Sequence, residues 1–150
     1  MARVPNITLT FHLNTPPKKV FQALTTSKGL TSWFLKSAEI SPKKGGTFRF
    51  GWAETGSPMK GKVLAVSPGK RIELQWNDKF DGKRFTTKAQ FVLRKKGKGT
   101  MLKLTHSGFK GGKKWIWLYG AINSGWAYYL ANLKSVLDHG TDLRDPLDAM

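Results

Sequence analysis

The chain has 150 residues, of which 39% are hydrophobic and 12% aromatic, so it can bury a core of its own. It contains no cysteine, which excludes disulfides, thiolate metal sites and a cysteine nucleophile. Lysine and arginine number 26 against 9 aspartate and glutamate, and the resulting net charge of +17 attracts polyanions.

Apolar residues at every second position of 7–13 predict a half-buried strand. Thr15 is a suitable helix cap and Pro16 suits the first helical position, so a helix is expected to begin there. Ser27 is expected to cap a second short helix, which carries apolar residues within 30–34.

From Lys36 onward, short alternating segments are separated by glycine- and proline-rich turns. One strand is expected before the turn at 42–46, and five follow it, near 48–52, 59–67, 72–76, 85–93 and 102–104. Strands joined by turns of a few residues must be antiparallel, because parallel pairs need long crossovers.

Residues 115–138 place apolar side chains at spacings of three and four, which predicts a long amphipathic helix. Gly140 is expected to stop it. The order of elements predicts an α+β fold in which a curved antiparallel sheet of about seven strands wraps the long helix. We expect a single domain over 1–150, with its core at about 5–141 and a loose tail at 142–150.

No stretch reaches the roughly 20 apolar residues that a membrane-spanning helix needs. The first 14 residues alternate and lack the continuous apolar core of a signal peptide. We therefore expect a soluble, cytoplasmic protein.

Three passages resemble the START-like, helix-grip superfamily (SRPBCC, with the START/Bet v-like fold), and within it the branch named after the activator of heat shock protein 90 ATPase. The first joins a P-x-x-V-F-x-A-L helix at 15–24 to a Trp-Phe pair, and the second is a G-x-F-x-F strand at 46–50. The third is H-x-G-F within 105–109, followed by a helix bearing G-W and L-x-x-L-K-x-x-L. The resemblance covers about residues 5–141.

The resemblance implies a cavity between the sheet and the helix, and its relatives include carriers of hydrophobic ligands, polyketide cyclases, stress proteins and a co-chaperone domain. The residues expected to line that cavity are mostly aromatic: Trp33, Phe34, Phe48, Phe50, Trp52, Trp76, Phe91, His106, Phe109, Tyr119, Ile122 and Trp126. The alternative is that these side chains simply fill the core.

His106 is the one histidine in phase with the inner face of its strand, where it could meet a ligand with Tyr119 or Arg49 nearby. The alternative is a structural histidine bonded to a loop carbonyl. The sequence shows no paired carboxylates, nucleophile elbow, phosphate loop or His/Asp cluster. We therefore predict no catalytic residue, no metal site and no cofactor.

A basic surface is predicted from a hairpin and a loop near Trp115 and Trp117, and it comprises Arg94, Lys95, Lys96, Lys98, Lys110, Lys113 and Lys114. Basic side chains beside an aromatic ring suit single-stranded nucleic acid, but two solvated loops are the preferred explanation. Any such binding is expected to be weak and non-specific.

Three functions therefore remain open. The first is binding of a small hydrophobic or aromatic ligand, for which a stress-related role is one option. The second is docking of the basic surface on an acidic partner, either a chaperone or nucleic acid, and the third is a cyclase-type enzyme. The sequence leaves open whether the protein is a monomer or a homodimer.

Overall fold

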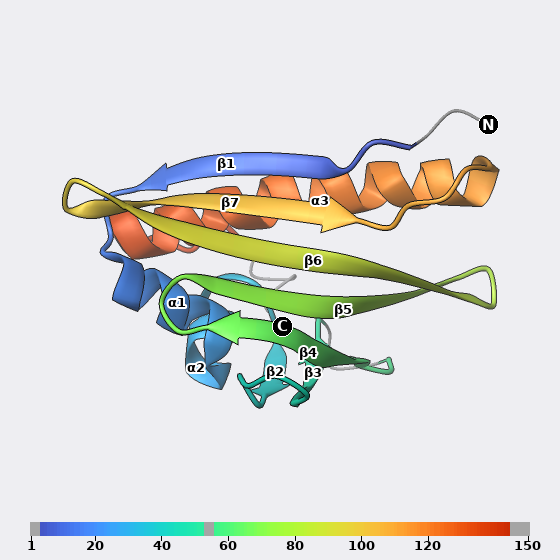
Figure 1. Cartoon of the computed structure of the whole chain (residues 1–150), viewed down its shortest axis with the longest axis horizontal. Helices are drawn as coiled ribbons and strands as arrows, with labels where there is room; N and C mark the ends of the chain where they lie inside the picture. Colours follow the sequence, from blue (N-terminus) through green and yellow to red (C-terminus); the bar gives the residue numbers. More distant parts are fainter. Residues whose placement is uncertain (1–3, 53–55, 145–150) are drawn as a thin grey trace.

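The computed structural model describes residues 4–52 and 56–144. Its elements in chain order are β1 (Ile7–Leu13), α1 (Pro17–Thr25), α2 (Ser27–Trp33), β2 (Ser37–Ile40), β3 (Thr47–Gly51), β4 (Met59–Ser67), β5 (Arg71–Phe80), β6 (Lys83–Lys96), β7 (Gly99–Ser107) and α3 (Lys113–His139). The strands form one antiparallel sheet in the order β1-β7-β6-β5-β4-β3-β2 (Figure 1).

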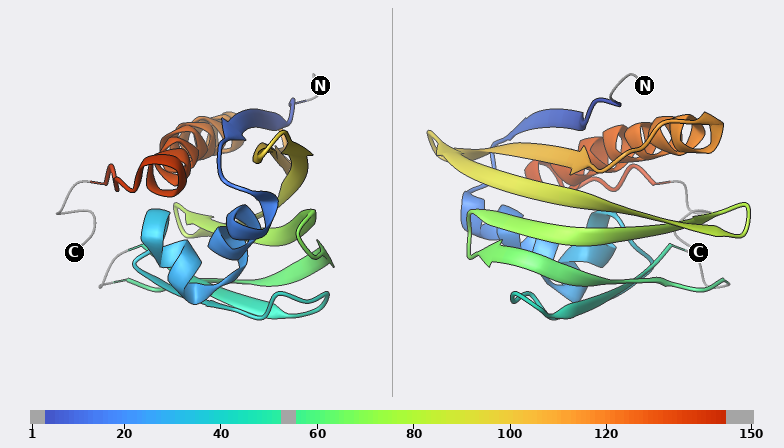
Figure 2. Two further views of the ribbon diagram at one scale, coloured as in Figure 1. Left: turned by 90° about the vertical axis from the view of Figure 1, so that its left-hand side faces the viewer. Right: turned by 45° about the vertical axis from the view of Figure 1, so that its right-hand side comes forward.

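The sheet curls about an interior that α3 closes along one side and that α1 and α2 close at one end (Figure 2). This arrangement confirms the predicted helix-grip architecture, including the seven strands and the two short helices after the first. Antiparallel strands of this length twist and curl, so a single rod can lie in the concave side. The long helix supplies that rod.

Alternation along each strand decides which side chains enter the interior. On β6, Phe85, Thr87, Ala89 and Phe91 are buried, whereas the residues that alternate with them are exposed or half-buried. From α3, Leu130 and Leu133 enter the same core and are fully buried. The apolar side chains that recur every two residues on the strands therefore pack in one layer against those that recur every 3.6 residues on the helix.

The helix starts differ from those predicted. The cap of α2 is Thr26, whose Oγ1 accepts a hydrogen bond from the Gly29 amide at 3.0 Å, so Ser27 is already the first helical residue. Pro16 occupies the cap position of α1 without a side-chain cap bond. Thr15 has another role, because its hydroxyl donates to Oδ1 of Asp138 at 2.8 Å.

Asp138 ties the last turn of α3 to the end of β1. Besides the Thr15 hydroxyl, it accepts hydrogen bonds from the amides of Asn14 at 2.9 Å and Thr15 at 3.2 Å, and from Nζ of Lys134 at 3.2 Å. Burial raises the pKa of this carboxyl, but the hydrogen bonds from Asn14, Thr15 and Lys134 outweigh it and hold the pKa below its ordinary value. Gly140 then ends the helix at a positive φ of 69°, as predicted.

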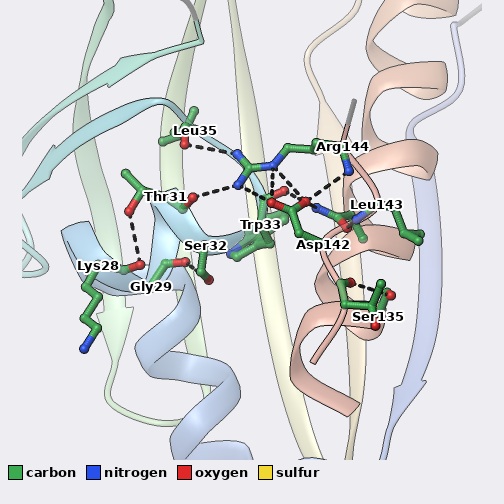
Figure 3. A network of polar contacts seen from close by, with 12 residues as sticks. Lys28, Gly29, Thr31, Ser32, Trp33, Leu35, Ser135, Asp142, Leu143 and Arg144 are labelled. Carbon is green, nitrogen blue, oxygen red and sulfur yellow. Dashed lines mark hydrogen bonds and ion pairs between the residues drawn. The ribbon is translucent and has the colours of Figure 1, made fainter. Parts of the chain in front are cut away.

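Hydrogen bonds hold residues 142–144, which follow α3, against the rest of the protein (Figure 3). For these three residues the expected loose tail is corrected. The guanidinium of Arg144 donates to the carbonyl of Thr31 at 2.9 Å and to that of Leu35 at 3.2 Å. Buried Asn132 donates to Trp33 O at 2.8 Å and to Asp142 Oδ1 at 2.9 Å. These bonds fix the end of α2 against α3. Residues 145–150 lie outside the described part of the chain.

Candidate functional site

Phe34, which follows α2, is the centre of an aromatic cluster between the helices and the sheet. Its ring centroid lies 5.3 Å from that of Trp126 and 4.9 Å from that of Tyr129, both on α3. From the sheet side it meets Trp52 at 5.4 Å and Trp76 at 6.3 Å. Ring pairs at such distances each stabilise by about 0.5–1.5 kcal/mol beyond burial. The cluster therefore joins the layers that the fold brings together.

A recess of about 100 Å³ remains beside this cluster. Its wall carries no carboxylate, lysine, arginine or histidine and consists of Phe34, Trp52, Trp76, Ile122, Gly125, Trp126 and Tyr129. Four of these, Trp52, Ile122, Gly125 and Tyr129, are half-buried, so the recess opens to solvent. Deeper in the core, a second space measures about 10 Å³. Close-packed side chains thus occupy most of the interior, as is normal for proteins.

Five of the predicted pocket residues line the recess: Phe34, Trp52, Trp76, Ile122 and Trp126. Four others are buried core side chains outside it: Trp33, Phe48, Phe50 and Phe91. The remaining three do not line the recess but adjoin it through His106, whose ring lies 5.9 Å from that of Trp76. In this group Phe109 lies 5.2 Å from His106 and 4.9 Å from Tyr119 between ring centroids. Tyr129 was missed, although it follows Ile122 by seven positions on one helix face.

His106 lies on the inner face of β7, as predicted, and is fully buried. Nδ1 accepts a hydrogen bond from the indole Nε1 of Trp126 at 3.0 Å, and Nε2 lies 2.6 Å from the Thr87 hydroxyl. Burial lowers the pKa of His106 to about 3. The alternative in which His106 bonds to a loop carbonyl is wrong, because both ring nitrogens form hydrogen bonds with side chains. Arg49 is also not a neighbour, since it is exposed on the outer face of the sheet.

Asp78 on β5 is an acid that the sequence analysis did not single out. It follows Trp76 by two residues and so continues an apolar, inward-facing alternation, which is the signal that could have identified it. Burial raises the pKa of Asp78 to about 6, and its Oδ2 has no hydrogen-bond partner. With Trp52 and Met59 it lines a hollow of about 520 Å³. A carboxyl with this pKa can exchange a proton near neutral pH beside the recess.

The predicted basic surface is divided between the two ends of the molecule. Residues 94–98 form the turn between β6 and β7, whereas the lysines at 110–114 lie near the opposite turn, between β5 and β6 (Figure 1). An ion pair of 2.8 Å between Lys114 and Asp81 fixes the second group at that end. Strand β6 separates the two turns, and its 14 residues span about 43 Å at 3.3 Å each.

Large apolar side chains are exposed at the start of α3, beside the second basic group. Ile116 is 64% exposed and Trp117 is 58% exposed. The Trp117 ring stacks on Phe80 from β5 with centroids 4.3 Å apart. Trp115 is half-buried, and Nζ of Lys110 lies 6.0 Å from its ring. We call this surface the aromatic tip; it comprises Phe80, Ile116 and Trp117 with Lys110, Lys113 and Lys114.

No group of three or more His, Asp or Glu side chains in residues 4–52 and 56–144 is placed to hold a metal ion. Within the same residues, none of the helices is both long enough and apolar enough to cross a membrane.

Comparison with known proteins places the chain among a set of similar structures. The family described as "Activator of Hsp90 ATPase homolog 1-like protein" matches residues 14–138. Protein MLL2253 from Mesorhizobium loti is 27% identical, with a TM-score of 0.80 over 93% of this chain and 100% of that one. The Aha1 dimer from Colwellia psychrerythraea is 26% identical, with a TM-score of 0.74 over 92% and 99%. CalU16 from Micromonospora echinospora, at 21% identity and a TM-score of 0.71 over 95% and 78%, shares the fold. A search of curated proteins gave no match.

Proposed function

Because the chain belongs to the family of activator of Hsp90 ATPase homolog 1-like proteins, whose fold commonly binds ligands, we propose that it binds a small hydrophobic or aromatic molecule between its sheet and α3. The observation that carries the proposal is the recess beside Phe34, which keeps an apolar wall open to solvent. Elsewhere the same interior is filled by packed rings. An apolar space of this kind gains free energy when an apolar group replaces water in it.

The size of the recess limits what enters it. An apolar cavity of about 150 Å³ holds a benzene molecule, so about 100 Å³ admits one small ring or a short branched chain. A larger ligand extends through the open side, past the half-buried rings of Trp52 and Tyr129. A polar group on such a ligand would face the hollow that contains Asp78.

The test is titration with N-phenyl-1-naphthylamine, a neutral fluorescent probe that the basic surface does not attract electrostatically. We expect saturable uptake by the native protein, about one probe per chain, with the negative heat-capacity change of apolar burial. Gly125→Leu places a side chain in the recess and is expected to abolish uptake. Gly120→Leu, the same change at an exposed position of the same helix, is the matched control.

Uptake that is unchanged in Gly125→Leu, or that begins only as the protein unfolds, contradicts the proposal.

A second candidate function is docking on an acidic partner, which the aromatic tip supports. Its exposed Ile116 and Trp117 offer apolar contact, and the lysines at 110, 113 and 114 give it positive charge. The test is anisotropy of a labelled peptide that alternates glutamate and leucine. Trp117→Ser is expected to weaken binding at least fivefold, whereas Lys98→Gln at the far turn changes it little. Equal effects of the two variants would show non-specific attraction instead.

A further inference from the structure

A groove of about 500 Å³ runs along the outer face of the sheet, on the side away from α3. Its lining comes from β2 to β6: Glu39, Thr47, Phe48, Arg49, Lys60, Gly61, Lys62, Gln75, Asn77 and Arg84. Most of these positions alternate with inward-facing core residues, so the strand pleat itself places them together. The groove is separate from both the recess and the aromatic tip.

Beside the groove the regular pairing of β4 with β5 ends. The two strands pair from Val63 opposite Leu74 onward, after which an irregularity shifts the register, whereas residues 59–62 pair with β3. The side chain of Asn77 links the two strands before Val63, since its Nδ2 donates to the carbonyl of Lys60 at 2.7 Å. The Thr86 hydroxyl donates to Asn77 Oδ1 at 2.9 Å and fixes the amide. The floor is thereby held in one geometry by bonds within the protein.

Gly61 shows how tightly this floor is built. A Cβ added at this position would lie 2.5 Å from both the Phe48 ring and the carbonyl oxygen of Gln75. Both contacts are too short for any side chain, and the second atom belongs to the backbone. Glycine therefore lets the Phe48 ring and the β4 backbone approach each other and gives the groove a partly apolar base.

Four cations line the groove, and none of them forms an ion pair with a carboxylate of the described residues: Arg49, Lys60, Lys62 and Arg84. Other cations of the same face are paired, since Arg71 and Lys88 each lie 2.8 Å from an oxygen of Glu73. One carboxylate, Glu39, also lines the groove. Among the residues that line the groove, four positive charges against one negative leave an excess of three, while Asp78 lies in the adjoining hollow that Lys60 and Arg84 also line.

We propose that this groove binds a small organic anion carrying two or more negative charges on phosphate-type groups. A single carboxylate would leave most of the cations unpaired, whereas a phosphorylated or pyrophosphorylated molecule offers several oxygens to them. The arginines Arg49 and Arg84 suit this chemistry because a guanidinium can hold two oxygens of one phosphate. The Gln75 amide nitrogen and the Phe48 edge remain for the organic part, because the Asn77 amide is engaged by Lys60, Gln75 and Thr86. The volume of about 500 Å³ lies within the usual range for small-molecule sites.

The experiment uses the intact protein and inorganic pyrophosphate, titrated by calorimetry at 0.15 M salt. We expect saturable one-to-one binding that shifts the NMR signals of the Gly61 amide and the Asn77 side chain. Arg84→Gln and Lys62→Gln are each expected to weaken binding about tenfold, as loss of a charge-assisted bond does. Arg94→Gln is the matched control, because Arg94 is exposed on the same strand and in phase with Arg84, ten residues away. It should change the affinity less than twofold.

Three outcomes overturn the proposal. The first is an equal loss in Arg94→Gln, which would mean that net charge alone attracts the anion. The second is binding that reaches several ions per chain without saturation. The third is tight binding of a ten-nucleotide single strand with none of pyrophosphate, which would make the groove a nucleic-acid surface. All the substituted side chains are exposed, so unchanged far-UV dichroism will confirm that the variants fold. Naphthylamine uptake, which concerns the recess, is independent of each result.

Discussion

The indole of Trp126 donates to Nδ1 of His106 across a distance of 3.0 Å, and both side chains are buried. An indole nitrogen can only donate, so Nδ1 carries no proton and the neutral imidazole is protonated at Nε2. That proton is directed at the Thr87 hydroxyl, 2.6 Å away. One hydrogen-bonded chain thus connects α3 to β7 and β6 inside an otherwise apolar core.

We predict that Trp126→Phe destabilises the protein by about 1–3 kcal/mol, because it leaves His106 Nδ1 buried without a partner. Trp126→Ala also creates a cavity and is expected to cost about 3–5 kcal/mol. Urea titration measures both. Trp117→Ala is the control, since that tryptophan is 58% exposed and its loss should cost about 1 kcal/mol or less. Equal costs for the two alanine variants would show that the buried indole adds nothing.

The pH dependence of stability offers a second test, because the pKa of His106 is lowered and that of Asp78 is raised. The folded-state pKa of His106 is about 3 against an ordinary 6.5, so protonation of the unfolded chain removes stability as the pH falls below 6.5. The pKa of Asp78 is raised from 3.8 to about 6, so its contribution falls as the pH rises from 3.8 to 6. Each slope reaches about 1.4 kcal/mol per pH unit.

The two contributions therefore nearly cancel between pH 4 and 6, and Asp78→Asn should expose that of His106. The variant is expected to lose about 2–3 kcal/mol of stability between pH 6 and pH 4, whereas wild type changes little, as measured by urea titration at each pH. A variant whose stability parallels that of wild type over this range would mean that the pKa shift of Asp78 is absent.

The fold followed from the sequence because its signals are local and periodic. Alternation at 7–13 predicted β1, and the three-and-four spacing at 115–138 predicted α3 to within two residues at its start. The helix caps were harder to predict, since Thr15, Thr26 and Ser27 are all residue types that cap helices well. At the start of α1 a tertiary contact determines the outcome, because the Thr15 hydroxyl donates to Asp138 and does not cap the helix.

The site was less predictable, because the size of the recess depends on how completely the inward-facing side chains fill the space between the sheet and α3. A list of inward-facing rings does not reveal whether they leave a large cavity or, as here, about 100 Å³ at one edge. The partners of His106 come from 19 and 20 residues away in the sequence, beyond any local pattern. The outer groove was predictable in part, since Arg49, Lys60 and Lys62 alternate with buried or small residues, but the register shift between β4 and β5 was not.

The bond set around Asp138 gives a third prediction. Asp138→Asn keeps the shape but removes the charge that four donors share, and we expect a loss of about 1–3 kcal/mol. The contribution of the wild-type carboxylate should disappear as the pH falls below the ordinary aspartate value of 3.8, because its folded-state pKa is lowered. Thermal unfolding at pH 7 and pH 3 checks both. Stability that does not change on substitution at pH 7 would contradict the anchoring role.

Nucleic acid gives a fourth prediction. Since the two predicted basic groups lie at opposite ends of β6, we expect binding to single-stranded DNA to be weak and independent of sequence. It should also fall steeply between 50 and 200 mM salt, because release of counterions supplies most of the free energy. Anisotropy with two unrelated oligonucleotides measures this. Selective binding that survives 200 mM salt would contradict the expectation.

The last prediction compares two glycines in the middle of α3. A Cβ added at Gly120 or at Gly125 meets no other atom within 4 Å, so Gly→Ala creates no clash at either position. Alanine is favoured over glycine in a helix interior by about 1 kcal/mol, and each variant should gain about that much in urea titration. Gly125 borders the recess, whereas Gly120 is exposed elsewhere, so Gly125→Ala alone is expected to weaken naphthylamine uptake. A stability gain coupled to a loss of binding at Gly125, but not at Gly120, would indicate that glycine is kept there for the recess at the expense of helix stability. Undiminished uptake in Gly125→Ala would mean that the probe binds elsewhere on the protein.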